Sequence, residues 1–272
     1  MTHILRSPIF LAMLVALVIP GESAAPPPVA HVSLPELPPA VFAEGEELVY
    51  EVAWTVFKIG TIRITSFGNH RAQASIDSYE DLPFVDLHSV YYTVMDSALF
   101  SLGSWSLDKS EGLWYGLNYV PDSSGVRVWV DEISTREPSQ PPYRKERRDT
   151  LTLGSREFVD GLAIGFLPRM LIHTLQRADI PTVLDGKLGT TTYFFEGEKK
   201  QEAIDAVAEP VNVIVVHGST SVVGVFGMTG EFTGWFSDDA AAVPIKGELK
   251  VLLGSVTVEL IRWKRNGWSP PT

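Results

Sequence analysis

A two-residue periodicity runs through the chain from residue 44 onward and constrains its fold more than any other feature. Between residues 48 and 56 the larger apolar side chains occupy every second position, and the pattern returns at Ile62 and Ile64 after a turn expected at residues 58–60. Successive side chains of a strand point to opposite faces of a sheet, so this pattern predicts a β-hairpin with one buried face. Turn-forming residues separate further segments of the same kind. We predict strands at residues 72–78, 88–95, 98–107, 113–119, 126–133, 143–153, 190–196, 202–208, 211–217, 228–237, 242–252 and 255–265.

Residues 160–177 (DGLAIGFLPRMLIHTLQR) break this rhythm, because their apolar residues lie nearly all round a helical projection. Asp160 is placed to accept hydrogen bonds from the first free amides, and Arg169 lies toward the negative end of the helix dipole. Pro168 is expected to divide the segment into two short helical pieces or to kink it. A helix this apolar must be buried. The predicted fold is therefore mainly all-β: a curved antiparallel sheet that forms an open barrel or roll, with one short buried helix.

The first residues are typical of an export signal. Arg6 precedes an uninterrupted apolar run at residues 9–19, and the small residues Gly21 and Ser23 follow. This run is too short to span a bilayer. We predict a signal peptide at residues 1–23, a proline-rich linker at 24–41, a single β-rich domain at 42–265 and a frayed tail at 266–272. The expected location is the periplasm, with no transmembrane span in the mature chain.

Composition excludes several classes of function. The chain has no cysteine, which excludes disulfide scaffolds, thiolate metal sites, cysteine nucleophiles and lipid attachment to a cysteine. A formal net charge of −11 argues against nucleic acid as a partner. The nucleophile-elbow, phosphate-loop, dinucleotide-binding and zinc-protease motifs are all missing from the sequence. We therefore predict no cofactor and no metal site.

Three blocks resemble the bacterial exported domain-of-unknown-function family numbered 3108. They are the glycine-led first hairpin at residues 42–60, the segment after Asp160, and the C-terminal block that begins with Trp-Phe-Ser-Asp-Asp at residues 235–239. That family usually has a basic residue just before the proline of the last block, where this chain has alanines at 240–242. The resemblance implies a periplasmic β-protein of no settled activity. The matching motif residues are Trp235, Ser237, Asp238, Asp239, Pro244 and Gly254.

Asp238 and Asp239 are the candidate catalytic residues, because two carboxylates on one tight turn can share a proton and act as acid and base. The alternative is structural and is the one we favour. Aspartate side chains accept hydrogen bonds from nearby backbone amides in turns, and adjacent strand residues would point to opposite faces.

Aromatic residues in neighbouring predicted strands are the candidate ligand-binding residues. Tyrosine and tryptophan on a curved sheet can line an apolar cavity and present polar tips to a lipid, a glycan or another amphiphile. The same residues can instead fill a core. The candidates are Tyr91, Tyr92, Trp105, Trp114, Tyr119 and Trp129.

These observations leave three hypotheses for the function. The first is a non-catalytic periplasmic binding or scaffold protein of the cell envelope, with an amphiphile in a barrel-like cavity and residues 160–177 as plug or lid. The second is an envelope polysaccharide hydrolase or lyase that uses Asp238 and Asp239. The third is an interaction module that binds an envelope protein through an edge strand. The basic residues at 144–148, with Arg262, Lys264 and Arg265, are interpreted as solvated edge charges or as a dock for an anionic partner.

Overall fold

The computed structural model describes residues 38, 40–80, 82, 86–138, 144–153, 155–174, 176–222, 230–250 and 254–272. The predicted signal peptide and nearly all of the predicted linker lie outside these residues. The described part forms one fifteen-stranded sheet with two short helical pieces. The elements are β1 (Glu47–Trp54), β2 (Phe57–Phe67), β3 (Arg71–Ser78), β4 (His88–Met95), β5 (Ser101–Ser110), β6 (Leu113–Pro121), β7 (Arg127–Thr135), β8 (Arg144–Thr152), β9 (Val159–Asp160), a 3-10 helix (Ala163–Gly165), α1 (Leu167–Leu171), β10 (Arg177–Leu184), β11 (Lys187–Glu202), β12 (Val211–Thr220), β13 (Gly230–Ser237), β14 (Pro244–Lys250) and β15 (Ser255–Lys264).

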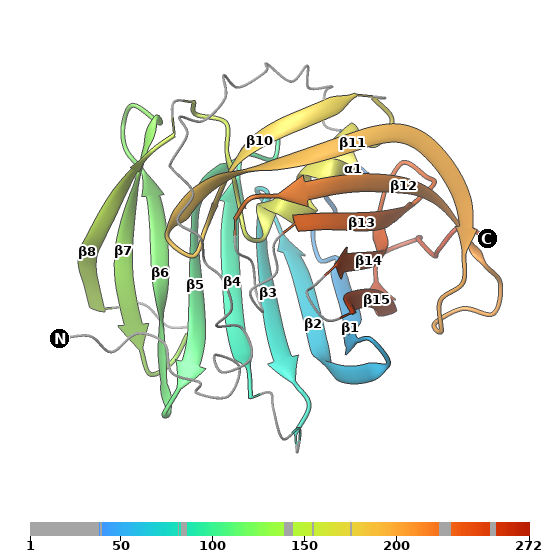
Figure 1. Ribbon diagram of the computed structural model, residues 1–272, viewed down its shortest axis with the longest axis horizontal. Helices are drawn as coiled ribbons and strands as arrows, with labels where there is room; N and C mark the ends of the chain where they lie inside the picture. Colours follow the sequence, from blue (N-terminus) through green and yellow to red (C-terminus); the bar gives the residue numbers. More distant parts are fainter. Residues whose placement is uncertain are drawn as a thin grey trace.

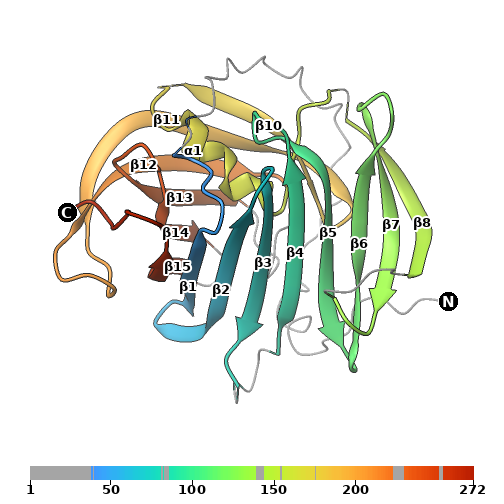
Figure 2. The same cartoon turned by 180° about the vertical axis from the view of Figure 1, so that it is seen from behind.

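The sheet is a continuous meander whose first and last strands meet in its middle. Strands β1 to β8 follow one another outward on one side of β1, while β15 pairs with the other side of β1 and leads back through β14 to β9. Every neighbouring pair is antiparallel except β9 with β10. Figures 1 and 2 show β10 to β13 crossing over the strands of the first half, with α1 between the two parts. The predicted fold class, a curved and incompletely closed β-roll around a short buried helix, is confirmed.

The core lies between the two parts of the sheet and is filled largely by the chain around α1. We call residues 158–172 the plug segment. Its nine buried apolar side chains are at Phe158, Val159, Leu162, Ala163, Phe166, Leu167, Met170, Leu171 and Ile172. They pack on inward-facing residues from both halves of the sheet, such as Ala72, Ile180 and Tyr193. The plug segment thus fills the interior of the roll.

The predicted helical segment is divided into two short pieces, as expected, but the break lies at Phe166 rather than at Pro168, and the pieces cover much less than residues 160–177. Pro168 lies in the first turn of α1, where its missing N–H is tolerated. Residues 177–184, whose first residue we placed in the helix, form strand β10. Pro181 within β10 is compatible with a strand because β9 pairs only with Thr182 and Val183, so the proline nitrogen has no partner to lose.

Three further expectations are wrong. The first hairpin turns at Thr55, which has a positive φ of 55°, rather than at residues 58–60. Residues 202–208 do not form a separate strand, because β11 continues to Glu202 past a bulge. The tail is not frayed. The main-chain N–H of Asn212 donates to the carbonyl of Pro271 at 2.6 Å, and the Trp268 ring packs edge-on against Trp263.

Candidate functional site

A narrow polar cleft lies where the far end of the sheet closes over the inner face of β4 to β6. Its volume of about 10 Å³ is the space of one water molecule. One wall comes from the first half of the sheet and the other from β9, the start of the plug segment and the end of β10. The lining residues are Tyr91, Tyr92, Ser104, Trp105, Ser106, Tyr119, Asp160, Gly161, Val183 and Leu184.

Strand register places polar side chains on the inner face of the cleft. Tyr91 is paired with Ser106, and Ser104 is paired with Tyr119, so each pair projects to the same side of the sheet. The Ser104 hydroxyl is buried and has no hydrogen-bond partner in the part of the chain that the structure describes. An unsatisfied buried hydroxyl is unfavourable, so Ser104 is a local cost to the stability of the fold.

Asp160 anchors the start of the plug segment. Its Oδ2 accepts hydrogen bonds from the hydroxyls of Thr93 (2.5 Å) and Ser101 (2.7 Å). Its Oδ1 accepts the main-chain amides of Leu162 (2.8 Å) and Ala163 (3.0 Å), which confirms the predicted role of this aspartate in capping the first amides. With four donors in place, the buried Asp160 carboxylate is fully engaged in holding the segment against β4 and β5.

A second carboxylate, Asp108, gives this region its acidic character. Ser89 donates its hydroxyl to Asp108 Oδ1 at 2.5 Å. Burial raises the pKa of Asp108 above its usual value, and the nearby Asp185 carboxylate raises that pKa further. Burial also raises the pKa of Tyr91, with Asp108 contributing in the same direction. None of the lining residues carries a positive charge, so the cleft disfavours added negative charge.

The β10–β11 turn closes the cleft through Tyr119. The main-chain N–H of Gly186 donates to the Tyr119 hydroxyl at 2.9 Å, and burial raises the pKa of this tyrosine. The main-chain N–H of Ser101 donates to the carbonyl of Phe158 at 2.9 Å. Strands β5 and β6 are therefore joined to the β9–β10 end of the sheet by individual hydrogen bonds.

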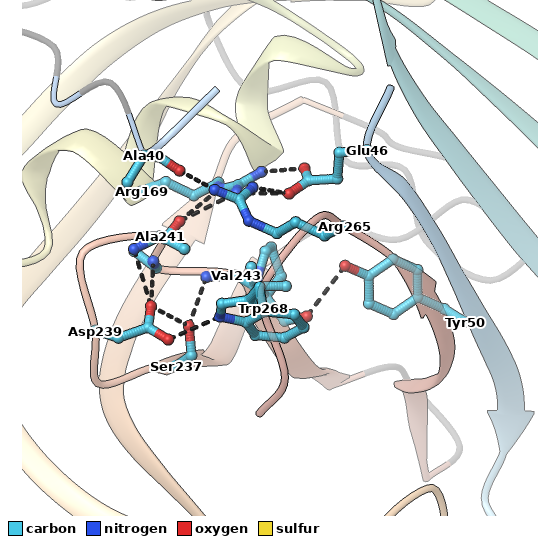
Figure 3. A network of polar contacts seen from close by, with 12 residues as sticks. Ala40, Glu46, Tyr50, Arg169, Ser237, Asp239, Ala241, Val243, Arg265 and Trp268 are labelled. Atoms are coloured by element: carbon cyan, nitrogen blue, oxygen red, sulfur yellow. Dashed lines mark hydrogen bonds and ion pairs between the residues drawn. The ribbon is translucent and has the colours of Figure 1, made fainter. Parts of the chain in front are cut away.

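A buried ion-pair network anchors the other end of the plug segment (Figure 3). Arg169 of α1 donates to both carboxylate oxygens of Glu46, at 2.8 and 3.2 Å, and to the carbonyl of Ala241 at 3.0 and 3.2 Å. Arg265 donates to the same carboxylate and to the carbonyl of Ala40. The Glu46 and Arg169 side chains are each only 1% exposed. Three separate parts of the chain, around residues 40–46, 241 and 265, thus converge at α1.

Two guanidinium groups share one carboxylate in this network. Burial alone would raise the pKa of Glu46, but the positive charges and hydrogen bonds of Arg169 and Arg265 hold it below the usual value. The carboxylate is therefore ionised at neutral pH and compensates the buried positive charge.

Asp238 and Asp239, the candidate catalytic pair, are held apart in different interactions. Asp239 accepts the amides of Ala241 (2.9 Å) and Ala242 (3.1 Å) and the indole N–H of Trp268 (2.8 Å). Asp238 instead forms an ion pair with Lys199, with 2.7 Å between the charged atoms. This geometry is that of a turn, and it does not support a shared proton.

The other motif residues complete the same turn and its surroundings. The Ser237 hydroxyl donates to Asp239 at 2.9 Å and accepts the amide of Val243 at 2.8 Å. Tyr50 donates its hydroxyl to the carbonyl of Pro244 at 3.0 Å. Trp235 is half-buried on β13, and Gly254 has a positive φ of 87°. Ser237 and Asp239 lie beside the anchor of α1 (Figure 3), whereas Gly254 lies against Thr55 at the other end of β1.

The six candidate aromatic residues do not converge on one cavity. Tyr91 and Tyr119 face the cleft from the inner face. Tyr92 and Trp105 border it too, but they alternate with inward-facing residues along β4 and β5, so their rings stack on the outer face at 5.5 Å. Trp129 lies under the guanidinium of Arg147 at 4.6 Å. Trp114 is half-buried on β6 and is not among the residues that line the cleft.

Sequence reasoning missed the residues that define both anchors and the cleft. Arg265 and Glu46 were not recognised as buried partners of Arg169. Small polar residues at alternate positions, Ser104 and Ser106 followed by Asp108, were a usable signal. This alternation places small polar side chains on one face of the strand, and it would have indicated polar residues on the inner face of the roll.

Several comparisons define what the chain is similar to. No family model and no curated protein matches it. The crystal structure of a beta-barrel-like protein of the domain of unknown function DUF1849 from Brucella abortus is similar over 82% of this chain and 98% of that one, with a TM-score of 0.53 and 9% identity. The crystal structure of LprF from Mycobacterium bovis is matched over 87% of this chain and 93% of that one, with a TM-score of 0.30 and 13% identity.

Two further findings concern membranes and metals. Within the part of the chain that the structure describes, no helix has the length and apolar character that a membrane crossing requires. Among the same residues, no three histidine or acidic side chains are grouped closely enough to hold a metal ion. At 9% identity the similarity to the DUF1849 protein concerns the fold alone. The chain has a beta-barrel-like fold.

Proposed function

We propose that this protein is a non-catalytic binding protein of the bacterial cell envelope that holds an amphiphilic ligand in the space now filled by the plug segment. One observation carries the proposal: the interior of the roll is occupied by a piece of the chain that contributes only two residues, Val159 and Asp160, to the sheet. Its other attachments include apolar packing and the polar anchors at Asp160 and Arg169. The carbonyl of Ile164 also accepts a hydrogen bond from the Tyr193 hydroxyl at 2.9 Å.

The strands that surround the plug segment present apolar side chains to it. Inward-facing residues from both halves of the sheet supply these side chains, including Ala74 of β3 and Val216 of β12. An acyl chain that replaces the plug segment would meet a largely preformed surface, which reduces the entropy lost on binding. The polar cleft lies at the entrance to this space, because Asp160 and Gly161 form both its wall and the start of the plug segment.

The free energies of apolar burial determine how much of the plug segment one ligand displaces. Burial of nine apolar side chains stabilises the closed form by roughly 14–27 kcal/mol at about 1.5–3 kcal/mol each. A sixteen-carbon acyl chain gains about 13 kcal/mol on burial at about 0.8 kcal/mol per methylene. A single chain therefore displaces part of the plug segment, and a lipid with two chains displaces most of it.

Export to the periplasm and membership of family 3108 belong to the same proposal. Support for export comes from the signal-like residues 1–23, and support for the family comes from the motif at residues 235–239. The hydrolase alternative is not favoured, because Asp238 and Asp239 are held by different partners. The edge-strand alternative is not favoured either. Strand β8 carries charged residues and a bulge opposite Val130 and Asp131, and both features protect an edge from pairing.

The proposal is tested by native mass spectrometry of the full chain, purified without detergent from a Gram-negative periplasm. We expect a discrete additional mass that dissociates when the protein unfolds and that organic extraction identifies as a lipid or another amphiphile. A protein that carries no such mass, and that also fails to bind an added fluorescent amphiphile, contradicts the proposal.

A reversible lock provides the structural test. A Cβ atom built on Gly161 would lie 2.6 Å from Leu184 Cδ1, so side chains at these two positions meet, and we choose them for a pair of cysteines. The chain has no other cysteine. We expect the oxidised Gly161→Cys/Leu184→Cys variant to bind N-phenyl-1-naphthylamine at least about tenfold more weakly than the same protein after reduction. Each single cysteine variant is the control, and equal binding before and after reduction would contradict displacement of the plug segment.

A further inference from the structure

The turn between β1 and β2 carries the two most exposed large apolar side chains among the residues that the structure describes. Val56 is 83% exposed and Phe57 is 64% exposed. The turn is short, because Trp54 at the end of β1 pairs with Phe57 at the start of β2. We call residues 55–57 the hairpin tip. This turn lies at the lower edge of the sheet in both views, away from α1 (Figures 1 and 2).

The residues of the hairpin tip are poorly suited to a turn. Tight hairpin turns favour glycine, asparagine and aspartate, whereas Thr55 and Val56 are both β-branched. Thr55 also has a positive φ of 55°, which is unfavourable for a β-branched residue. The conformation is held in place because the main-chain N–H of Thr55 donates to the carbonyl of Ser255 at 2.9 Å. The hairpin tip is therefore a fixed projection whose apolar side chains face solvent.

Amphipathic side chains lie directly behind the hairpin tip. Lys58 follows Phe57 in β2 and forms an ion pair with Glu51. Tyr79 donates its hydroxyl to the same carboxylate at 2.9 Å. The main-chain N–H of Tyr79 donates to the carbonyl of Ile59 at 3.1 Å, so this tyrosine lies about two residues, or roughly 7 Å, behind Phe57 along the strand. Lysine and tyrosine are typical of the headgroup level of a membrane, because each joins an apolar body to a polar end.

The small area of the hairpin tip favours a bilayer over a protein as its partner. A specific protein interface buries about 800 Å² on each side, which is more than two side chains supply, since even an aromatic residue buries only about 150–250 Å². Apolar side chains enter lipid individually, and each gains free energy in proportion to its own buried area. The net charge of −11 disfavours anionic lipids. A zwitterionic bilayer is therefore the surface that these side chains fit.

We propose that the hairpin tip is a membrane-docking element that inserts Val56 and Phe57 into the surface of a zwitterionic bilayer. Lys58 and Tyr79 then lie among the headgroups. Docking is weak and reversible, because only two side chains enter the apolar layer. Strand β1 starts beside the anchor of α1 and runs for eight residues to Trp54, so the tip is roughly 26 Å along the sheet from that anchor. Docking and amphiphile binding thus use different parts of the molecule, and either can fail without the other.

The experiment measures the partition of the protein, purified from a Gram-negative periplasm, into large vesicles of phosphatidylethanolamine and phosphatidylcholine by flotation. Phe57→Ser is compared with Leu102→Ser, which removes an apolar side chain of β5 that is 57% exposed. We expect Phe57→Ser to lower the partition coefficient about tenfold and Leu102→Ser to leave it within about twofold. Equal effects of the two variants, or no binding of the parent protein to these vesicles, overturn the inference.

Val56→Asn separates docking from folding. Asparagine is favoured in hairpin turns, so this variant should melt at the same temperature as the parent protein or at a higher one, while its partition coefficient falls about fivefold. A lower melting temperature would mean that Val56 supports the fold, which overturns the inference. Phosphatidylglycerol in the vesicles should weaken docking of the parent protein, and stronger docking overturns the preference for zwitterionic lipid. Each variant should retain the amphiphile in native mass spectrometry, so loss of docking is distinguishable from failure of the proposed function.

Discussion

Replacement of Glu46 by glutamine removes the carboxylate that Arg169 and Arg265 share in the network that anchors α1. The glutamine retains the shape of the side chain and one acceptor oxygen, so the principal change is electrostatic. Arg169 is 1% exposed and Arg265 is 7% exposed at their side chains. Both guanidinium groups would therefore remain buried without a negative partner from this position.

Removal of one partner from a buried ion pair destabilises proteins by about 3–5 kcal/mol. For a domain of this size, each kcal/mol lowers the melting temperature by about 2–4 °C. We therefore expect Glu46→Gln to lower the free energy of unfolding by about 4 kcal/mol and the melting temperature by roughly 8–16 °C. The measurement is urea-induced and thermal unfolding, followed by circular dichroism at neutral pH.

The next residue provides a matched control. Glu47 forms an ion pair with Arg63 at 2.7 Å, but these side chains are 32% and 45% exposed. Exposed pairs of this kind contribute about 0–1 kcal/mol, so Glu47→Gln should change stability by less than about 1 kcal/mol. If Glu46→Gln and Glu47→Gln destabilise the protein equally, the reasoning about the buried network is refuted.

The same network predicts a pH dependence. The pKa of Glu46 is lower in the folded protein than its ordinary value of 4.5. The folded state therefore binds this proton less tightly, and its contribution to stability is complete above the ordinary pKa and is lost as the pH falls through the folded pKa. The Glu46→Gln variant should lack this part of the loss of stability at acid pH. If its urea midpoint depends on pH as that of the parent protein does, the role assigned to the Glu46 carboxylate is contradicted.

Three other predictions follow from individual contacts. Asp239→Asn should lower the free energy of unfolding by about 1–2 kcal/mol through weakened amide contacts, while Asp238→Asn should change it by less than about 0.5 kcal/mol; equal effects in urea unfolding would contradict the turn assignment. Gly116→Ala should prevent stable folding, because its Cβ would lie 1.8 Å from the carbonyl of Ser106, whereas Gly103→Ala, with 3.5 Å to its nearest neighbour, should fold normally by circular dichroism. The pKa of Asp108 is raised in the folded state, so ionisation of this carboxyl lowers the stability of the fold as the pH rises from the unfolded-state pKa to the folded-state pKa. Asp108→Asn should remove this part of the pH dependence of the urea midpoint. If the urea midpoints of the variant and of the parent protein change with pH in the same way between pH 3 and 7, this prediction is refuted.

Local patterning was sufficient to predict most of the sheet. Strand β4 was predicted with the bounds that it has in the structure, His88–Met95, because alternating burial is encoded in consecutive residues. The role of Asp160 and the division into two short helical pieces were also predictable, since both depend on hydrogen bonds within one or two turns of the chain.

Features that depend on distant partners were not predictable in this way. Arg169 lies 123 residues from Glu46, and Arg265 lies 219 residues from it, so no local pattern connects them. Strand β10 was missed because Asp179 and Pro181 disfavour a strand locally, whereas its pairing with β11 along Arg177–Leu184 overrides that preference. The strand register of β4 to β6 places the candidate aromatic residues on both faces of the sheet, and this register cannot be read from composition.

The central claim is that a ligand takes the place of the plug segment, and hydrogen exchange tests it most directly. The amides of Leu162 and Ala163 donate to the buried Asp160 carboxylate, so they exchange slowly while the plug segment is in place. With saturating dodecylammonium below its micellar concentration, we expect exchange across residues 158–172 to accelerate at least about tenfold, while exchange in β1 to β3 stays unchanged. Slower or unchanged exchange in the plug segment, with the amphiphile bound, would contradict the account.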